Sequence, residues 1–298
     1  MKIKFIQLFI VCFVAGLSAQ QKRTIGSVER LHADMDLFVP QSAEIEILAE
    51  GFEWSEGPVW VEPLNAVLFS DVPKNKIYKW DEKNGLTVFL DPSGFTGIAP
   101  REKKGSHNAM NRDESGSNGL TLDQNGQLVI CMHGDRRVAR LKDWERKSFT
   151  TVIGKYQDKY FNSPNDLVYA KNGDLYFTDP PYGLKKGDDD PWKELDFNGV
   201  FKLTSRGELS LIIDDLTRPN GVAISNDQKT LYVAISDPKN PRIMAYNIVH
   251  DGVENGRVFF DGNALAKKNK GSFDGLKVHP SGALFSTGPG GVLIITPQ

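Results

Sequence analysis

A short pattern that recurs four times along this chain of 298 residues constrains its fold more than any other feature. Each copy has a polar group carrying Asn or Asp, then an apolar run, a tight turn and a second apolar run. The recurring residues are Asn118, Asn165, Asn220 and Asp274, at spacings of 47, 55 and 54 positions. Strand pairs with Asn, Asp or Gly turns, repeated about every 50 residues, are typical of a β-propeller. The sequence therefore predicts an all-β fold with one propeller.

The polar residue that opens each copy has a predictable place in such a fold. The innermost strand of every propeller blade starts at the same rim, so a residue just before that strand points toward the axis. Glu56, within Ser55-Glu56-Gly57-Pro58-Val59-Trp60, occupies the same place in an earlier and more divergent copy. We therefore expect five side chains to converge at one rim: Glu56, Asn118, Asn165, Asn220 and Asp274.

The chemistry of these five side chains favours a metal site, because Glu, Asp and Asn offer oxygen ligands. Oxygen ligands suit Ca²⁺ first and then Mg²⁺ or Mn²⁺; Zn²⁺ remains an alternative, although it prefers the His and Cys side chains that this repeated position lacks. Two carboxylates balance a divalent charge and leave room for a substrate carbonyl. Asp274 as a general base beside the ion is a second option, and simple capping of turns is a third.

Composition and the N-terminus indicate the class and destination of the protein. Charged residues make up 25% of the chain and the formal net charge is −2, which gives no basic surface for nucleic acid. Lys2 and Lys4 precede an apolar run that ends in Ser18-Ala19, a pattern that predicts a signal peptide over residues 1–19; an N-terminal membrane anchor is the alternative. We expect a secreted or periplasmic protein with no membrane contact after cleavage. Its only remaining cysteine, Cys131, is expected to be buried.

The remaining chain divides into a polar leader over residues 20–43 and a propeller over residues 44–298. The alternating segment Glu44–Ala49 predicts a strand that completes the last blade. Counting inner hairpins from Glu56 gives five copies, and the fifth lacks its outermost strand. If the architecture has six blades, we expect most of the last blade to be missing at the C-terminus. The sequence does not indicate an oligomeric state.

Three segments between the copies receive more specific expectations. Residues 91–116 are long and lack periodicity, so they are expected to be either a lid over the converging side chains or a plain insertion, with His107 among them. His133 emerges at the end of a strand close to the second copy, where a catalytic or substrate-binding role and a structural role are both open. The charged segment 185–194 is predicted to be a solvated connection.

Six spaced motifs, from about Phe52 to the end of the chain, resemble the gluconolactonase family that includes regucalcin, the senescence marker protein, and related sugar lactonases. Four are general to that family: Glu56-Gly57-Pro58-Val59-Trp60, Ser163-Pro164-Asn165-Asp166, Pro219-Asn220-Gly221 and Phe273-Asp274-Gly275. Two resemble its bacterial gluconolactonase branch: Ser117-Asn118-Gly119-Leu120 and His133-Gly134-Asp135-Arg136-Arg137. The resemblance implies a six-bladed propeller with one catalytic divalent metal. It departs in a longer insertion around Lys103 to Asp113 and in a C-terminus that stops about one blade early.

The same resemblance assigns roles residue by residue. It implies that Glu56, Asn165, Asn220 and Asp274 hold the metal, that Asp274 is also the catalytic base, and that Asn118 contacts substrate. With His133 as a further catalytic or substrate-binding candidate, the expected activity is metal-dependent opening of a sugar lactone, such as glucono-1,5-lactone to gluconate. An esterase or phosphotriesterase on the same metal site is one alternative, and a calcium-stabilised binding propeller without turnover is another.

Overall fold

The computed structural model describes residues 22–100 and 113–297 of the chain. The predicted signal peptide, His107 and most of the expected insertion lie outside these residues. The chain divides into two units, Met1–Glu50 and Gly51–Gln298. Among the described residues, the helices are all too short or too polar to cross a membrane.

The first unit contains little regular structure. A 3₁₀ helix, η1 (Ala33–Leu37), is its longest element, and its N-terminus is capped by the side chain of His32. The segment Glu44–Ala49, for which alternation predicts a strand, forms only one isolated antiparallel bridge, between Glu46 and Thr24. A salt bridge of 2.9 Å between Lys22 and Glu46 lies beside that bridge.

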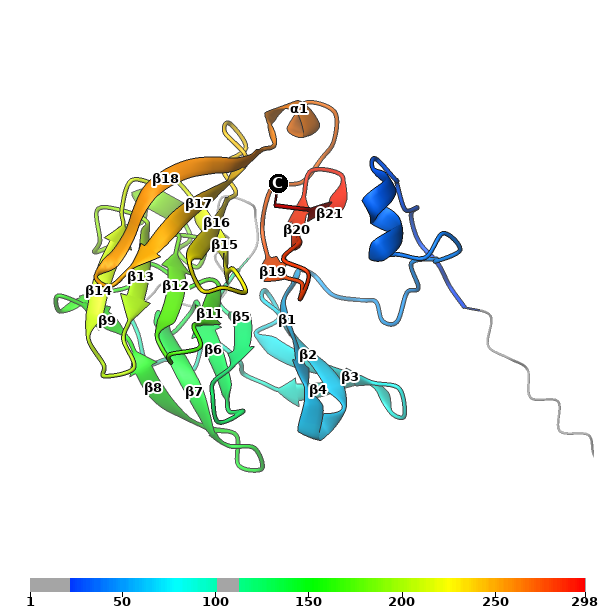
Figure 1. Cartoon of the computed structure of the whole chain (residues 1–298). Helices are drawn as coiled ribbons and strands as arrows, with labels where there is room; N and C mark the ends of the chain where they lie inside the picture. Colours follow the sequence, from blue (N-terminus) through cyan, green and yellow to red (C-terminus); the bar gives the residue numbers. More distant parts are fainter. Residues whose placement is uncertain (1–21, 101–112, 298) are drawn as a thin grey trace, which may run out of the picture. The chain divides into compact units, whose positions relative to one another are not determined.

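The second unit consists of five antiparallel sheets, each built from strands that follow one another in the chain (Figure 1). The first sheet contains β1 (Ser55–Val61), β2 (Ala66–Asp71), β3 (Lys76–Asp81) and β4 (Gly85–Leu90). The second contains β5 (Ser117–Leu122), β6 (Leu128–Met132), β7 (Arg137–Asp143) and β8 (Ser148–Ile153). The third contains β11 (Leu167–Tyr169), β12 (Leu175–Asp179), β13 (Gly199–Leu203) and β14 (Leu209–Ile213). The fourth contains β15 (Pro219–Ile224), β16 (Thr230–Ile235), β17 (Arg242–Val249) and β18 (Gly252–Asp261). The fifth has three strands, β19 (Leu276–Val278), β20 (Leu284–Gly288) and β21 (Gly291–Ile295).

Short elements connect these sheets. A two-stranded ribbon, β9 (Lys155–Tyr156) with β10 (Lys159–Tyr160), separates the second sheet from the third. Two 3₁₀ helices, η2 (Glu62–Leu64) and η3 (Gly187–Asp189), and one short helix, α1 (Asn263–Ala266), lie in loops.

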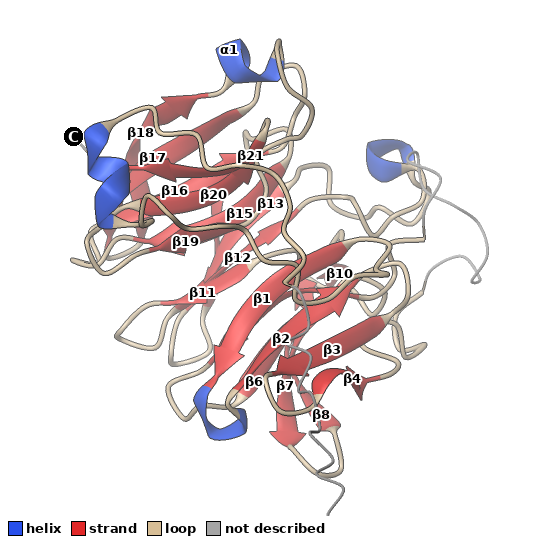
Figure 2. Cartoon of the chain, turned by 90° about the vertical axis from the view of Figure 1, so that its right-hand side faces the viewer, coloured by secondary structure: helices blue, strands red, loops and turns tan. Residues whose placement is uncertain are grey.

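The first strand of each sheet lies beside the first strand of the next. Contacts join β1 to β5, β5 to β11, β11 to β15 and β15 to β19. The sheets therefore follow one another around a common axis as propeller blades, with the later strands of each blade farther from that axis (Figure 2). The predicted all-β propeller is confirmed, with five blades among the described residues. The six-bladed architecture stays a prediction.

Apolar side chains between neighbouring blades form four separate cores. Between the second and third blades, Val129 and Cys131 of β6 pack with Phe177 of β12 and Phe201 of β13. The two phenyl rings are stacked with centroids 5.3 Å apart. Burial of each such side chain stabilises the fold by about 1.5–3 kcal/mol. The prediction that Cys131 is buried is confirmed, and burial raises the pKa of its thiol.

Candidate metal and substrate site

The five sequence-predicted residues sit at one recurring backbone irregularity. Glu56 in β1, Asn118 in β5 and Asn220 in β15 each lie where the register between the first and second strands of the blade shifts. A bulge of this kind turns a side chain away from the ordinary pleat of the strand. The three side chains are thus displayed at the same level of successive blades, as the repeat predicts.

Asn165 and Asp274 occupy the same place in the third and fifth blades, just before β11 and β19. The N–H of Asn165 donates to the carbonyl of Thr178, and the N–H of Asp274 donates to the carbonyl of Thr287, at 2.8 and 3.4 Å. The N–H of Thr178 in turn donates to the carbonyl of Asp166, and the N–H of Thr287 donates to the carbonyl of Gly275. The strand pairing therefore continues around these residues in a bulged form.

In the first four blades, the residue after the predicted site residue fits against the next blade. A Cβ on Gly119 would lie only 2.6 Å from the carbonyl oxygen of Asn165, and Gly57 and Gly221 face the carbonyls of Asn118 and Asp274 even more closely. Glycine is needed at these three places because the backbones of adjacent blades touch there. The third blade has an aspartate at this place in the repeat.

In the third blade the residue at this place is Asp166, which is 5% exposed. One of its carboxylate oxygens, Oδ2, accepts a hydrogen bond of 3.1 Å from the N–H of Val222 in the fourth blade. The sequence analysis did not select Asp166 as a site residue. The signal was present, because the chain has Asp here where the other copies have Gly.

The carboxyl groups of Glu56 and Asp274 meet in the structure, although they come from the first and fifth blades. The carboxyl group of Asp274 lies close to the carboxyl group of Glu56 and to the side-chain amide of Asn220. The indole N–H of Trp54 donates to Oε1 of Glu56 at 2.6 Å. Both residues keep some accessible surface, although burial acts strongly on their carboxyl groups.

Burial and like charge raise the pKa of both carboxyl groups. Desolvation is the largest cause for Asp274, and the charges of Asp166 and Glu114 add to it, raising the pKa to about 7. Desolvation and then the charge of Asp274 raise the pKa of Glu56 well above its ordinary value. Four acidic side chains thus lie within electrostatic reach of one point. Such a point attracts a cation.

Glu114 is the other acidic residue that the sequence analysis missed. It is 6% exposed and follows the long segment after the first blade, where no periodicity marks it. Its negative charge raises the pKa of Glu56, of Asp274 and of Tyr182. Only the folded chain brings it to the other carboxylates.

Two amide oxygens beside the carboxyl pair lack hydrogen-bond partners. Asn165 Oδ1 and Asn220 Oδ1 are buried, and neither accepts a hydrogen bond from the described residues. A buried carbonyl oxygen without a donor is costly unless it meets a cation or another donor. Within the described residues, no group of three His, Cys, Asp or Glu side chains is arranged to hold a metal. A cation here would therefore use amide oxygens as well as carboxylates, a donor set that fits Ca²⁺.

His133 lies behind Asn165 and is fully buried. Its Nδ1 is 3.2 Å from the carbonyl oxygen of Glu114, and its Nε2 is 3.4 Å from Nδ2 of Asn165. A carbonyl only accepts, so Nδ1 carries the proton and Nε2 accepts from the Asn165 amide. This arrangement turns Oδ1 of Asn165 away from the ring. It favours a role in orienting Asn165, and the substrate contact expected from the sequence stays a prediction.

Asn118, the predicted substrate residue, is 5% exposed. Its backbone carbonyl accepts from the hydroxyl of Ser70 at 2.8 Å, which anchors the residue to the first blade. Its side-chain amide has no hydrogen-bond partner among the described residues. The structure therefore leaves this amide available to a ligand.

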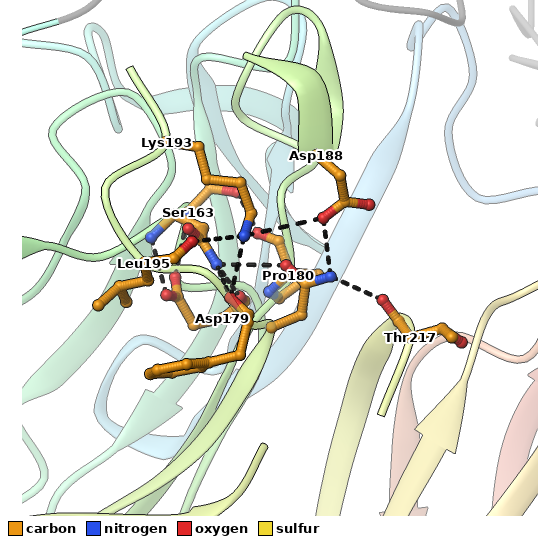
Figure 3. Close-up of polar contacts among 10 residues, drawn as sticks. Ser163, Asp179, Pro180, Asp188, Lys193, Leu195 and Thr217 are labelled. Atoms are coloured by element: carbon orange, nitrogen blue, oxygen red, sulfur yellow. Dashed lines mark hydrogen bonds and ion pairs between the residues drawn. The ribbon is translucent and has the colours of Figure 1, made fainter. Parts of the chain in front are cut away.

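A buried network of polar groups supports the backbone just before Asn165 (Figure 3). The carboxylate of Asp179 accepts from the N–H groups of Asn162 and Ser163 at 2.7 and 2.8 Å. Nearby, Nζ of Lys193 donates to the carbonyl of Leu195 at 2.5 Å. Burial raises the pKa of Asp179 to about 7 and lowers the pKa of Lys193.

The expectation of a solvated connection over residues 185–194 holds for part of the segment. Lys186, Asp188, Asp189, Pro191 and Trp192 are exposed. Lys185 and Asp190, in contrast, are each only 7% exposed. Asp190 accepts from the backbone of Lys186 and Trp192, so this charge satisfies backbone groups of the loop and does not face solvent.

A separate cavity of about 380 Å³ lies at the ends of the second and third blades that are farther from the converging residues. Asp123, Arg140 and Tyr169 are among its lining residues, and none of the five converging residues is. Asp123 and Arg140 pair with each other at 2.8 Å. Because these two charges already neutralise each other, the cavity is a weaker candidate than the acidic site for binding a cation.

The blade order and the acidic cluster at one rim define a propeller with a single candidate cation site. Residues 54–298 match the model of the SMP-30/Gluconolactonase/LRE-like region, and the chain belongs to this family.

Similar proteins agree with that assignment. The chain is 38% identical to a gluconolactonase of Zymomonas mobilis over 278 residues, which are 92% of this chain and 76% of that protein. A gluconolactonase structure from Xanthomonas campestris superposes with a TM-score of 0.73 at 29% identity, covering 89% of this chain and 79% of that one. Regucalcin of Agrobacterium tumefaciens, a calcium-binding protein, superposes with a TM-score of 0.56 at 16% identity, covering 80% and 68% of the two chains, and shows the shared fold alone.

Proposed function

We propose that this protein is a metal-dependent lactonase that opens a sugar lactone such as glucono-1,5-lactone. The family and the 38% identity to the Zymomonas gluconolactonase support the reaction class. The metal dependence rests on one observation of this chain. Asn165 Oδ1 and Asn220 Oδ1 are buried without donors beside the joined carboxyl groups of Glu56 and Asp274.

In this proposal Glu56, Asn165, Asn220 and Asp274 hold one divalent cation, Ca²⁺ before Mg²⁺, Mn²⁺ or Zn²⁺. Such an ion, when bound, supplies positive charge that polarises the carbonyl of the lactone. The indole N–H of Trp54 donates to Oε1 of Glu56 at 2.6 Å and would hold that carboxyl group in place for the ion.

The remaining steps use protein groups alone. The carboxylate of Asp274 takes a proton from the water that attacks the lactone carbonyl and returns it to the ring oxygen as the acyl C–O bond of the lactone breaks. The free amide of Asn118 hydrogen-bonds a hydroxyl or the ring oxygen of the sugar, which fixes the face presented to that water. His133 keeps the Asn165 amide in one orientation through its Nε2.

Lactone hydrolysis with and without chelator tests the proposal. Proton release from D-glucono-1,5-lactone should exceed the spontaneous rate, stop after chelation and return with Ca²⁺. The Glu56→Gln and Asp274→Asn variants should stay at the spontaneous rate. Wild-type activity that survives complete chelation would remove the metal from the mechanism.

The two alternatives give different results in the same experiment. An esterase or phosphotriesterase would turn over aryl esters or phosphotriesters faster than lactones. A calcium-stabilised binding propeller would melt at a higher temperature with Ca²⁺ and hydrolyse none of these substrates.

We also propose that the complete ring has six blades. Gly57, Gly119 and Gly221 each press on the next blade, but a Cβ on Gly275 in the fifth blade would meet no described atom within 4 Å. That open face supports a further blade beside the fifth one. A chain extended by about 40 residues, the length of one such repeat, should melt at a higher temperature; equal melting temperatures would count against the sixth blade.

We also propose that the predicted signal peptide over residues 1–19 exports the protein and is then removed. Mass spectrometry of the protein from its native host should find a mature chain that begins at Gln20. A chain that retains Met1 in the cytoplasm would reject it.

A further inference from the structure

Arg218 is a charged residue at the site that the proposed mechanism does not use. It lies two residues before Asn220, at the start of β15, and is half-buried. Within residues 22–100 and 113–297, its guanidinium makes no hydrogen bond and no ion pair. A guanidinium carries five N–H donors and no acceptor, and holding it partly buried without a partner is costly. An acceptor group of a ligand would offset that cost.

Tyr182 supplies a second hydrogen-bonding group beside Arg218. Its hydroxyl contacts the hydroxyl of Ser236, and Ser236 is itself tied to the carbonyl of Arg218 through its N–H at 3.1 Å. Burial raises the pKa of Tyr182 to about 12, so the phenol is neutral and keeps its proton. The charges that act on this hydroxyl are the positive one of Arg218 and the negative ones of Asp274 and Glu114. The phenol is therefore within electrostatic reach of both the guanidinium and the acidic cluster.

The loop that carries Tyr182 is firmly held. The hydroxyl of Ser163 donates to the carbonyl of Pro180 at 2.5 Å and accepts from the N–H of Gly183 at 2.8 Å. Gly183 also packs so closely on His133 that an added Cβ would lie 2.9 Å from the Cβ of that histidine. The position of the phenol is thus built into the same framework that orients Asn165.

The site therefore has two chemically different sides. One side offers oxygen acceptors, from Glu56, Asp274 and the two unpartnered amides. The other side offers the N–H donors of Arg218, since the O–H of Tyr182 donates to Ser236, whose hydroxyl donates to the carbonyl of Arg218 at 3.4 Å. A group that only accepts hydrogen bonds and carries negative charge fits the second side, and a carboxylate matches the planar fork of a guanidinium.

We propose that Arg218, whose backbone is held by Ser236 and Tyr182, binds a carboxylate carried by the substrate, so that the preferred substrates are acidic sugar lactones derived from aldaric or uronic acids. This inference rests on the proposed lactonase function. Arg218 determines specificity and takes no part in bond cleavage. A neutral lactone leaves the guanidinium without its partner and gains less from the same site.

Two lactones that differ at one carbon test the proposal. D-Glucaro-1,4-lactone has a carboxylate where D-glucono-1,4-lactone has a hydroxymethyl group. Wild-type kcat/KM should be higher for the acidic lactone. Arg218→Gln should lower kcat/KM about 10- to 100-fold for the acidic lactone, the range expected for a charge-assisted hydrogen bond, and less than about threefold for the neutral one. Arg218→Lys should restore part of the loss.

Controls separate this result from a loss of folding or of the proposed function. Arg206→Gln removes the same charge from an exposed turn and should change neither substrate. Equal losses on both lactones, or no wild-type preference for the acidic one, would overturn the proposal. If the wild type opens neither lactone, the lactonase function fails, and calorimetry then decides the subsite by itself. Tighter binding of the acidic lactone that disappears in Arg218→Gln supports the subsite, and equal binding of both lactones rejects it.

Discussion

The close contact between the second and third blades at Gly119 predicts the effect of adding a single methyl group. Gly119 follows the site residue Asn118, and its N–H donates to the carbonyl of Asn165 at 2.7 Å. In Gly119→Ala the new Cβ would lie 2.6 Å from that carbonyl oxygen and 2.8 Å from both Cα and Oδ1 of Asp166. Real Cβ atoms essentially never come within 3.0 Å of such atoms. The third blade must therefore move away from the second.

The size of the effect follows from two opposing contributions. Overpacking of a close contact costs about 1–3 kcal/mol, while Gly→Ala in an unstrained position stabilises by about 0.4–1 kcal/mol through the unfolded chain. Gly275 offers a matched control, because it follows Asp274 in the same place of its repeat and an added Cβ there meets no described atom within 4 Å. Gly275→Ala should be neutral or slightly stabilising. The gain through the unfolded chain is common to both variants, so the overpacking cost of about 1–3 kcal/mol separates them. This corresponds to about 2–12 °C in Tm for a domain of this size.

Thermal and urea unfolding followed by circular dichroism measure this difference. Calcium titration calorimetry adds a second readout, since a displaced Asn165 should weaken binding in Gly119→Ala and leave it unchanged in Gly275→Ala. If the two variants melt within about 2 °C of each other, the close approach of the blades at Gly119 is not what the structure indicates, and the reasoning fails.

Three further predictions concern the acidic site and its support. The raised pKa values of Glu56 and Asp274 mean that protons compete with a cation, so Ca²⁺ affinity in calorimetry should fall as pH drops through about 7; affinity that is constant from pH 8 to pH 5 would contradict this. His133→Ala should weaken Ca²⁺ binding about 10-fold or more, because Asn165 loses the partner that orients it, whereas unchanged affinity with lower kcat would place His133 on the substrate. The raised pKa of Asp179 means that the folded state holds a proton that the unfolded state releases near pH 4, so its stabilising share is complete below pH 4 and is lost as pH rises to about 7. In urea unfolding from pH 4 to pH 7, Asp179→Asn should lack this decline, which is at most about 1.4 kcal/mol per pH unit; an identical slope in the variant would reject the raised pKa.

The architecture was predictable because it is repeated. Every blade reuses one hairpin pattern, so five weak signals support each other, and Asn118, Asn165 and Asn220 mark the same bulge each time. Even the divergent first copy was found, because Glu56 keeps its place before Gly57. A feature that appears once along the chain has no such support.

Three residues near the candidate site could not be predicted from the sequence for that reason. Glu114 follows a segment without periodicity, and Tyr182 lies in a loop whose direction depends on the contacts of Ser163 with Pro180 and Gly183. Arg218 precedes Asn220 by two residues, but no pattern distinguishes it from a solvated arginine. Their importance appears only when the blades are brought together, since each acts on a residue of another blade.

The pairing of Glu56 with Asp274 links the chemistry of the site to the integrity of the fold. Neighbouring blades are held by apolar cores, but these two residues belong to the first and fifth blades and are far apart in sequence. Their pKa values are both raised, so as pH rises and both groups ionise, the two negative charges repel each other. At lower pH a proton on one of the two carboxyl groups removes that repulsion. A cation would replace that proton and hold the same two blades at neutral pH. The residues proposed to bind the cation are therefore also the ones through which ligand binding stabilises the propeller, because a ligand that binds only the folded state raises its stability in proportion to RT ln(1 + [L]/Kd).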